Sequence, residues 1–112
     1  MKHDDPFYEQ YTSICKVIVS PMRLKIIEAI GSEKRNVSEI RTKLQISMSN
    51  LSNHLAALHG AGVVGREKQG NFIYYFLMEP GLLEVLQRMR VVIHSMMSKR
   101  NQMMMASDIM VG

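Results

Sequence analysis

A short polar stretch in the middle of the chain holds side chains that could contact the base edges and phosphates of a nucleic acid. The amide of Asn53 can pair with adenine at two points, and the hydroxyls of Ser49 and Ser52 can reach a phosphate or a base. Farther along, Arg66 and Lys68 add positive charge that would neutralise phosphates and make binding depend on salt. The residue types in this region therefore indicate DNA contact. The alternative is a polar, solvated helix face.

One helix and one hairpin must position these side chains. Ser47 carries the hydroxyl of a helix N-cap, and leucines then recur at helical spacing. These leucines are Leu51, Leu55 and Leu58. Gly60 and Gly62 end the helix, and two strands, the second over residues 72–77, follow around a turn at residues 69–71. A polar-faced helix beside a basic hairpin is typical of a winged helix-turn-helix protein, in which the helix enters the major groove.

Three helices and a short strand are expected before this stretch. The first helix covers residues 7–19, and the second begins at Ser20-Pro21 and runs to Ile30. A short strand at residues 36–37 leads into a third helix over residues 38–44. Because the linker to the next helix is very short, the third and fourth helices must cross sharply, as they do in a helix-turn-helix.

The last predicted helix begins at Pro80 and runs to about Ser107. Its residues alternate four and three apart along a heptad-like seam: Leu82, Leu86, Met89, Ile93, Met96, Arg100 and Met103. This helix would be roughly 40 Å long, more than so small a domain can cover. We therefore expect residues 7–19 and 80–107 to be dimerisation helices. The alternative is a helix folded back on its own domain with a loose tail.

Length and composition suit one modest domain. The chain has 112 residues, a net charge of +4 and a pI near 9.4, which permits nucleic-acid binding. We predict a single winged-helix domain over residues 1–112, mainly α with a small β-hairpin wing (α+β), a DNA-binding core at residues 21–78 and frayed ends. No apolar run reaches the length of a membrane span, and residues 1–6 lack the apolar core of a signal peptide, so a cytoplasmic protein is expected.

Positive charge is concentrated around the predicted reading helix. The basic residues there are Lys34, Arg35, Arg41, Lys43, Arg66 and Lys68. Only Glu39 and Glu67 oppose them. The first four basic residues could equally be secondary phosphate contacts or a solvated face.

The sequence contains no catalytic motif. It lacks a Gly-rich phosphate loop, a nucleophile elbow and paired carboxylates, so we predict neither an enzyme nor a bound cofactor or metal. Cys15 is the only cysteine, which excludes an intramolecular disulfide, and we expect it to be a small buried residue. A symmetric Cys15 pair across a dimer is the alternative, as a redox switch or soft-metal site. Met96, Met97 and residues 103–105 could bind copper(I), but adaptable packing is the stronger interpretation.

Several motifs follow one another in a specific order: SPMRLKII at residues 20–27, VSEI at 37–40, MSNLSNHL at 48–55, AGVV at 61–64 and a wing at 66–75. In this order the chain resembles the ArsR/SmtB family of winged-helix transcriptional repressors, from Ser20 to about Ile93. The resemblance implies a homodimer that binds operator DNA. It also implies release when an inducer binds, often a metal ion or an oxidant.

The resemblance also implies which residues of the fourth helix read DNA. His54 matches a histidine commonly present in the family, and it would either donate to a phosphate or bond within the domain. With the wing included, the predicted DNA-binding residues are Met48, Ser49, Ser52, Asn53, His54, Arg66, Lys68 and Asn71.

The resemblance does not extend to a sensor site. One metal-sensing subgroup has a Cys-x-Cys-type cluster on the third helix, where this chain has NVSEI at residues 36–40. Another subgroup places carboxylates and histidines on the last helix, which here holds only Glu84, His94 and a distant Asp108 at the wrong spacing. Thiol-based sensors need a cysteine pair, which this chain lacks.

We therefore predict a homodimeric repressor that binds pseudo-palindromic double-stranded DNA, with no membrane association. An unidentified signal, whether a small-molecule, metal or protein effector, would release it. One alternative is a winged-helix protein without an inducer site, controlled by a partner protein that docks on the Met-rich tail. The other is an interaction module that no longer binds DNA.

Overall fold

The computed structural model describes residues 5–111, with side chains described up to residue 107. The elements, in order, are α1 (Pro6–Ile18), α2 (Pro21–Ile30), β1 (Arg35–Asn36), α3 (Val37–Leu44), α4 (Met48–Gly60), β2 (Val64–Gln69), β3 (Phe72–Leu77) and α5 (Gly81–Val111). The chain divides after Pro80 into two compact units, one holding α1 to β3 and the other α5. The predicted fold, mainly helical with a small hairpin, is confirmed.

Each of the first four helices begins at a polar side chain that caps it. Asp5, Ser20, Asn36 and Ser47 accept hydrogen bonds from backbone amides in the first turns of α1 to α4. Proline occupies the start of α1 and α2, where its fixed φ suits a helix and its missing amide costs nothing.

Capping also accounts for two differences from the predicted boundaries. Pro6 was expected in a frayed end, but Asp5 caps the helix that Pro6 opens; residues 1–4 lie outside the described part of the chain. Val37 was expected in the short strand, but the cap at Asn36 places it at the first position of α3, and the strand lies one residue earlier.

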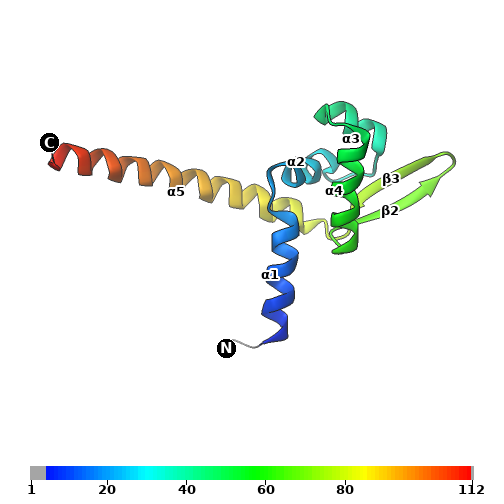
Figure 1. The fold of residues 1–112 in the computed structure, drawn as a ribbon, viewed down its shortest axis with the longest axis horizontal. Coiled ribbons are helices and arrows are strands. Elements are labelled where there is room, and N and C mark those ends of the chain that lie inside the picture. The colour runs from blue at the N-terminus through cyan, green and yellow to red at the C-terminus, as the bar shows by residue number, and fades with distance from the viewer. Residues whose placement is uncertain (1–4, 112) are drawn as a thin grey trace. The chain divides into compact units, whose positions relative to one another are not determined.

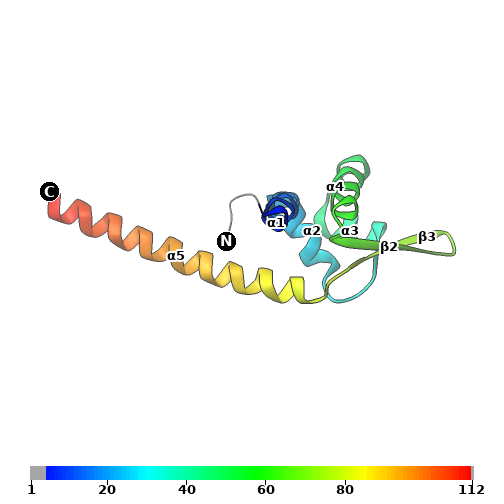
Figure 2. The same cartoon turned by 90° about the horizontal axis from the view of Figure 1, so that it is seen from below.

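A three-stranded antiparallel sheet in the order β1-β3-β2 lies beside the helices. The predicted hairpin is confirmed, with Gly70 in its turn at φ +61°, a left-handed conformation that glycine adopts without strain. In both views of the structure the β2–β3 hairpin projects away from α2, α3 and α4 (Figures 1 and 2). The pairing of β1 with β3, which joins Arg35 to Tyr75, was not predicted.

The core of the unit that holds α1 to β3 lies between α2, α3, α4 and the base of the sheet. Its largest fully buried side chains are Ile26, Ile27, Ile30, Ile40, Leu51, Leu55, Leu58 and Val64. The leucine stripe of α4 is thus buried as predicted. On α2 the buried side chains are Ile26, Ile27, Ala29 and Ile30, and Leu24 is half-buried.

Helix α5 is longer than predicted, since its backbone runs past Ser107 to Val111. At the usual rise, its 31 residues span roughly 46 Å. The seam residues Met89, Ile93, Met96 and Met103 are exposed in the single chain, with exposed fractions of 44% to 73%. In the part of the chain that the structure describes, no helix is both long enough and apolar enough to cross a membrane.

Candidate nucleic-acid interface

A tight turn sets α4 against α3. Gln45 ends α3 in the left-handed conformation at φ +52°, and Ile46 after it is buried. Ser47 then caps α4, because its hydroxyl oxygen accepts a hydrogen bond from the amide of Asn50 at 3.2 Å. Arg41 holds the turn from α3, since its Nε donates to the carbonyl oxygen of Ile46 at 3.3 Å. The short connection predicted between the third and fourth helices is therefore present.

Helix α4 has one buried face and one exposed face. The leucine stripe packs inward, and the predicted reading residues Met48, Ser49, Ser52 and Asn53 are all exposed. Ser52 and Asn53 take part in none of the side-chain hydrogen bonds found among the described residues. Their polar groups are therefore available to a partner molecule.

His54 lies half-buried at the edge between the two faces. Its Nδ1 accepts a hydrogen bond from Nε of Arg23 at 3.1 Å, and Nη1 of Arg23 donates to the carbonyl oxygen of Val17, also at 3.1 Å. Of the two roles considered for His54, the internal bond is observed. Because Nδ1 accepts, the ring proton is assigned to Nε2, which leaves one donor for a phosphate. The sequence held no signal for Arg23, which lies 31 residues away.

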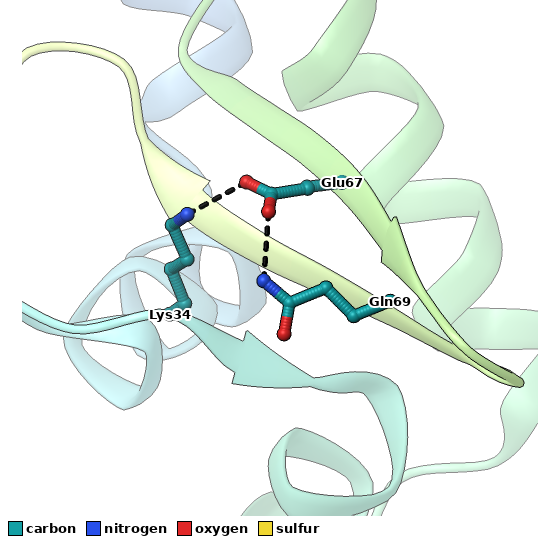
Figure 3. Close-up of polar contacts among 3 residues, drawn as sticks. All are labelled: Lys34, Glu67 and Gln69. Atoms are coloured by element: carbon teal, nitrogen blue, oxygen red, sulfur yellow. Dashed lines mark hydrogen bonds and ion pairs between the residues drawn. The ribbon is translucent and has the colours of Figure 1, made fainter.

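The hairpin separates its charges by strand alternation. Arg66 and Lys68 are exposed on one side of β2, and Glu67 and Gln69 point to the other. Nζ of Lys34 donates to Oε2 of Glu67 at 2.6 Å, and Nε2 of Gln69 donates to Oε1 of Glu67 at 2.7 Å. Figure 3 shows the two side chains converging on the Glu67 carboxylate. The hydrogen bond from Lys34, that from Gln69 and the charge of Lys34 all lower the pKa of Glu67. Glu67, the only carboxylate of the hairpin, is thus paired with Lys34 on the side of the strand opposite to Arg66 and Lys68.

The other basic residues near the reading helix differ in their surroundings. Lys34 is paired with Glu67 and also lies 5.5 Å from the centre of the Phe76 ring. Arg35 contacts the carboxylates of Glu33 at 3.4 Å and Glu39 at 3.8 Å. Arg41 is bonded within the turn, as described above. Lys43 is exposed at the end of α3. These pairings favour a structural role for Lys34 and Arg35.

A groove of about 650 Å³ runs between α4 and the hairpin. It brings together four of the eight predicted DNA-binding residues, Met48 and Ser52 from α4 and Arg66 and Asn71 from the hairpin. Ser49, Asn53, His54 and Lys68 do not line it. Phe72, exposed at 54%, is a lining residue that the sequence analysis missed. Phe72 follows directly after the predicted turn, and this position was the signal in the sequence that could have identified it as a lining residue.

Among residues 5–107, no group of three or more histidine, cysteine, aspartate or glutamate side chains could hold a metal ion. Cys15 was expected to be buried, but it is only half-buried. The reason is that α1 contributes just one buried side chain, Ile18, while Phe7, Tyr11 and Ile14 of α1 remain exposed.

Comparison with known proteins agrees with this geometry. Residues 20–65 match the model of the family described as "Bacterial regulatory protein, arsR family". The HTH-type transcriptional regulator Rv0081 of Mycobacterium tuberculosis is 31% identical over 97 residues, covering 86% of this chain and 85% of its own length. Its crystal structure superposes with a TM-score of 0.74 at 32% identity, over 87% of this chain and 98% of that one.

Two further proteins share the fold. The transcriptional activator HlyU of Vibrio cholerae is 29% identical over 79 residues, covering 68% of this chain and 73% of its own length, and its structure gives a TM-score of 0.71. The Mb0332 domain of Mycobacterium bovis, described as a homodimeric winged helix-turn-helix DNA-binding domain, gives a TM-score of 0.74 at 20% identity. That match covers 88% of this chain and 95% of the Mb0332 fragment.

Proposed function

The chain belongs to the arsR family of bacterial regulatory proteins, and from that premise we propose that it is a homodimeric repressor acting on a pseudo-palindromic DNA site. The family and the relatives named above are transcriptional regulators, not enzymes. The observation that carries the proposal is the groove in which the exposed face of α4 meets Arg66 and Asn71 of the hairpin.

In this proposal, α4 enters the major groove and the hairpin follows the neighbouring backbone. Met48, Ser49, Ser52 and Asn53 contact base edges or phosphates. The remaining predicted DNA-binding residues contact the backbone, namely His54, Arg66, Lys68 and Asn71. The groove between helix and hairpin would then hold one strand of the duplex. Phosphate contacts would set the position of the protein, and base contacts would set its sequence preference.

Two copies of the chain are proposed to pair through α1 and α5. Each helix carries large apolar side chains that are exposed in the single chain, including Phe7 and Tyr11 on α1 and Met89 and Met96 on α5. Exposed apolar surface of this kind marks a protein–protein interface. The homodimeric description of the Mb0332 domain supports the same assembly. Two reading helices in one dimer would engage half-sites about one helical turn apart.

The signal that would release the repressor is unidentified, whether small molecule, metal or protein. It would act by favouring a dimer geometry whose half-site spacing no longer fits DNA. In the second candidate, the chain has no effector site of its own and a partner protein controls it by docking on α5. The exposed methionines at positions 103–105 favour that candidate. Deleting the chain from Lys99 onward should then abolish the partner interaction and spare DNA binding.

A DNA titration at several salt concentrations tests the proposal. The probe is the region upstream of the protein's own gene, and the variants are Asn53→Ala and Arg66→Ala. Losing Arg66 removes one phosphate contact per protomer, so the slope of log K against log salt should become shallower by about 0.9 per contact, or about 1.8 for a dimer. Asn53→Ala should weaken binding and leave the slope unchanged.

Arg88→Ala is the matched control, because Arg88 is an exposed arginine of α5 that lies off the apolar seam. It should bind DNA as the unchanged chain does. If the chain binds no DNA even at low salt, the repressor proposal fails and the interaction-module alternative takes its place. A reporter fused to the same upstream region tests the sign of regulation. Higher transcription in the presence of the chain would indicate an activator, as the name of HlyU describes.

A further inference from the structure

The exposed face of α4 lacks the charged side chains that most specifically read a guanine or a cytosine. Helix α4 lies wholly within the described part of the chain and contains no arginine, lysine, glutamine, aspartate or glutamate. Guanine is most often read by the forked contact of arginine or by lysine, and cytosine by a carboxylate. His59 is exposed, but it lies in the last turn of α4, whereas recognition helices contact bases with their N-terminal residues.

Arginines near the N-terminal part of α4 make hydrogen bonds within the domain. Arg23 bonds His54 and the Val17 carbonyl, and Arg41 bonds the Ile46 carbonyl. Arg66 belongs to the hairpin, which lies along the backbone in the proposed complex. A G·C pair facing the start of α4 would therefore find no charged or forked partner on α4 itself, which disfavours such a pair.

What the same face does offer fits an A·T pair. Asn53 and Asn50 carry exposed amides, and an amide pairs with N6 and N7 of adenine at two points. Met48 stands at the first position of α4, is 43% exposed and lines the groove. Thymine is the only DNA base with a methyl group in the major groove, and apolar side chains are its natural contacts.

We propose that each half-site has an A·T core, in which Asn53 reads adenine and Met48 contacts the methyl group of a neighbouring thymine. This inference rests on the proposed DNA binding and names the class of sequence that is bound. It gives Met48 a role in specificity, although its thioether donates no hydrogen bond.

Selection from a pool of random duplexes is the first test, using the full chain. A·T pairs should dominate the half-site cores, and the preference should relax at one position with Asn53→Ala and at another with Met48→Ala. Conserved G·C pairs at the positions that these variants relax would overturn the inference and leave DNA binding intact. If no sequence is enriched over the starting pool, the proposed function itself fails, and the inference fails with it.

Replacing thymine by deoxyuridine in the selected duplex is the second test, since it removes the methyl group and keeps every hydrogen-bonding group. Burial of one methyl corresponds to about fourfold in affinity, so each contacted thymine should contribute about that factor. Met48→Ala should abolish the difference between the two duplexes. Met78→Ala should keep it, because Met78 is 56% exposed and lies outside the groove. Equal binding of both duplexes by the unchanged chain would overturn the role of Met48.

Discussion

Replacing Gly65 by alanine is expected to destabilise the sheet, because the added methyl group would overlap the Phe76 ring. An ideal Cβ at Gly65 would lie 2.5 Å and 2.7 Å from two ring carbons of Phe76 and 2.8 Å from the sulfur of Met78. Overpacking of this kind typically costs about 1–3 kcal/mol. Alanine also restricts the unfolded chain more than glycine does, which offsets about 0.5–1 kcal/mol of this cost. The net loss should therefore be up to about 2.5 kcal/mol.

Urea unfolding followed by far-ultraviolet circular dichroism measures this loss. All proteins must be compared at one concentration, since pairing of two chains would contribute to stability. Gly60→Ala is the matched control, because Gly60 ends α4 and nothing lies within 4 Å of an added Cβ. That variant should be as stable as the unchanged chain or gain up to about 1 kcal/mol, since alanine is the better helix former.

A second substitution separates the steric cause from a general intolerance of the strand. Phe76→Leu removes part of the ring that the new methyl group meets, so the Gly65→Ala, Phe76→Leu double variant should lose less stability than the sum of the single variants. A coupling of at least 0.5 kcal/mol is expected for residues in contact. Strictly additive losses, or a Gly65→Ala variant as stable as Gly60→Ala, would refute the steric reasoning.

Three other changes have clear expected outcomes. Ser47→Ala should lower the free energy of unfolding by about 1 kcal/mol by removing the cap on the Asn50 amide, and Ser47→Asp should largely retain it in the same urea assay. Leu55→Ala should lower it by about 2–5 kcal/mol, since Leu55 is only 2% exposed and its loss leaves a cavity. The pKa of Glu67 is lowered by Lys34, so the ion pair should stabilise the fold above the ordinary glutamate pKa and be lost as pH falls through the lowered value. Lys34→Met should bring the pKa of Glu67, measured by NMR, back toward its ordinary value, and an unchanged pKa would contradict the pairing.

The helix-turn-helix could be predicted from sequence because its signals are local. The hydroxyl of Ser47, the leucine stripe behind it and the glycines at Gly60 and Gly62 lie within one helix length and act on their own neighbourhood. The hairpin was predictable for the same reason, since its turn and its two strands are adjacent in the chain. The exposed positions of α4 followed once the leucine stripe had fixed which face is buried.

The features that were missed depend on segments far apart in the chain. The Arg23–His54 bond spans 31 residues and the Lys34–Glu67 pair spans 33, so neither leaves a local pattern. The strands β1 and β3 are also far apart in the sequence, so no local pattern predicts that they pair. The underestimate of α5 has another cause: its final stretch is rich in methionine, a good helix former, and offers no glycine or proline before Gly112 to mark an earlier end.

These distant pairs change what the positive charge around α4 can do. Lys34 and Arg35 form ion pairs with carboxylates. Arg66 and Lys68 lie on the side of β2 opposite to Glu67, whose charge is paired with Lys34. The reading face of α4 carries no formal charge from aspartate, glutamate, lysine or arginine. In the proposed complex, affinity and its salt dependence would therefore come mainly from the hairpin, and sequence preference from uncharged side chains on α4. Changes in the hairpin should weaken binding to all sequences alike, and changes on α4 should alter which sequences are preferred.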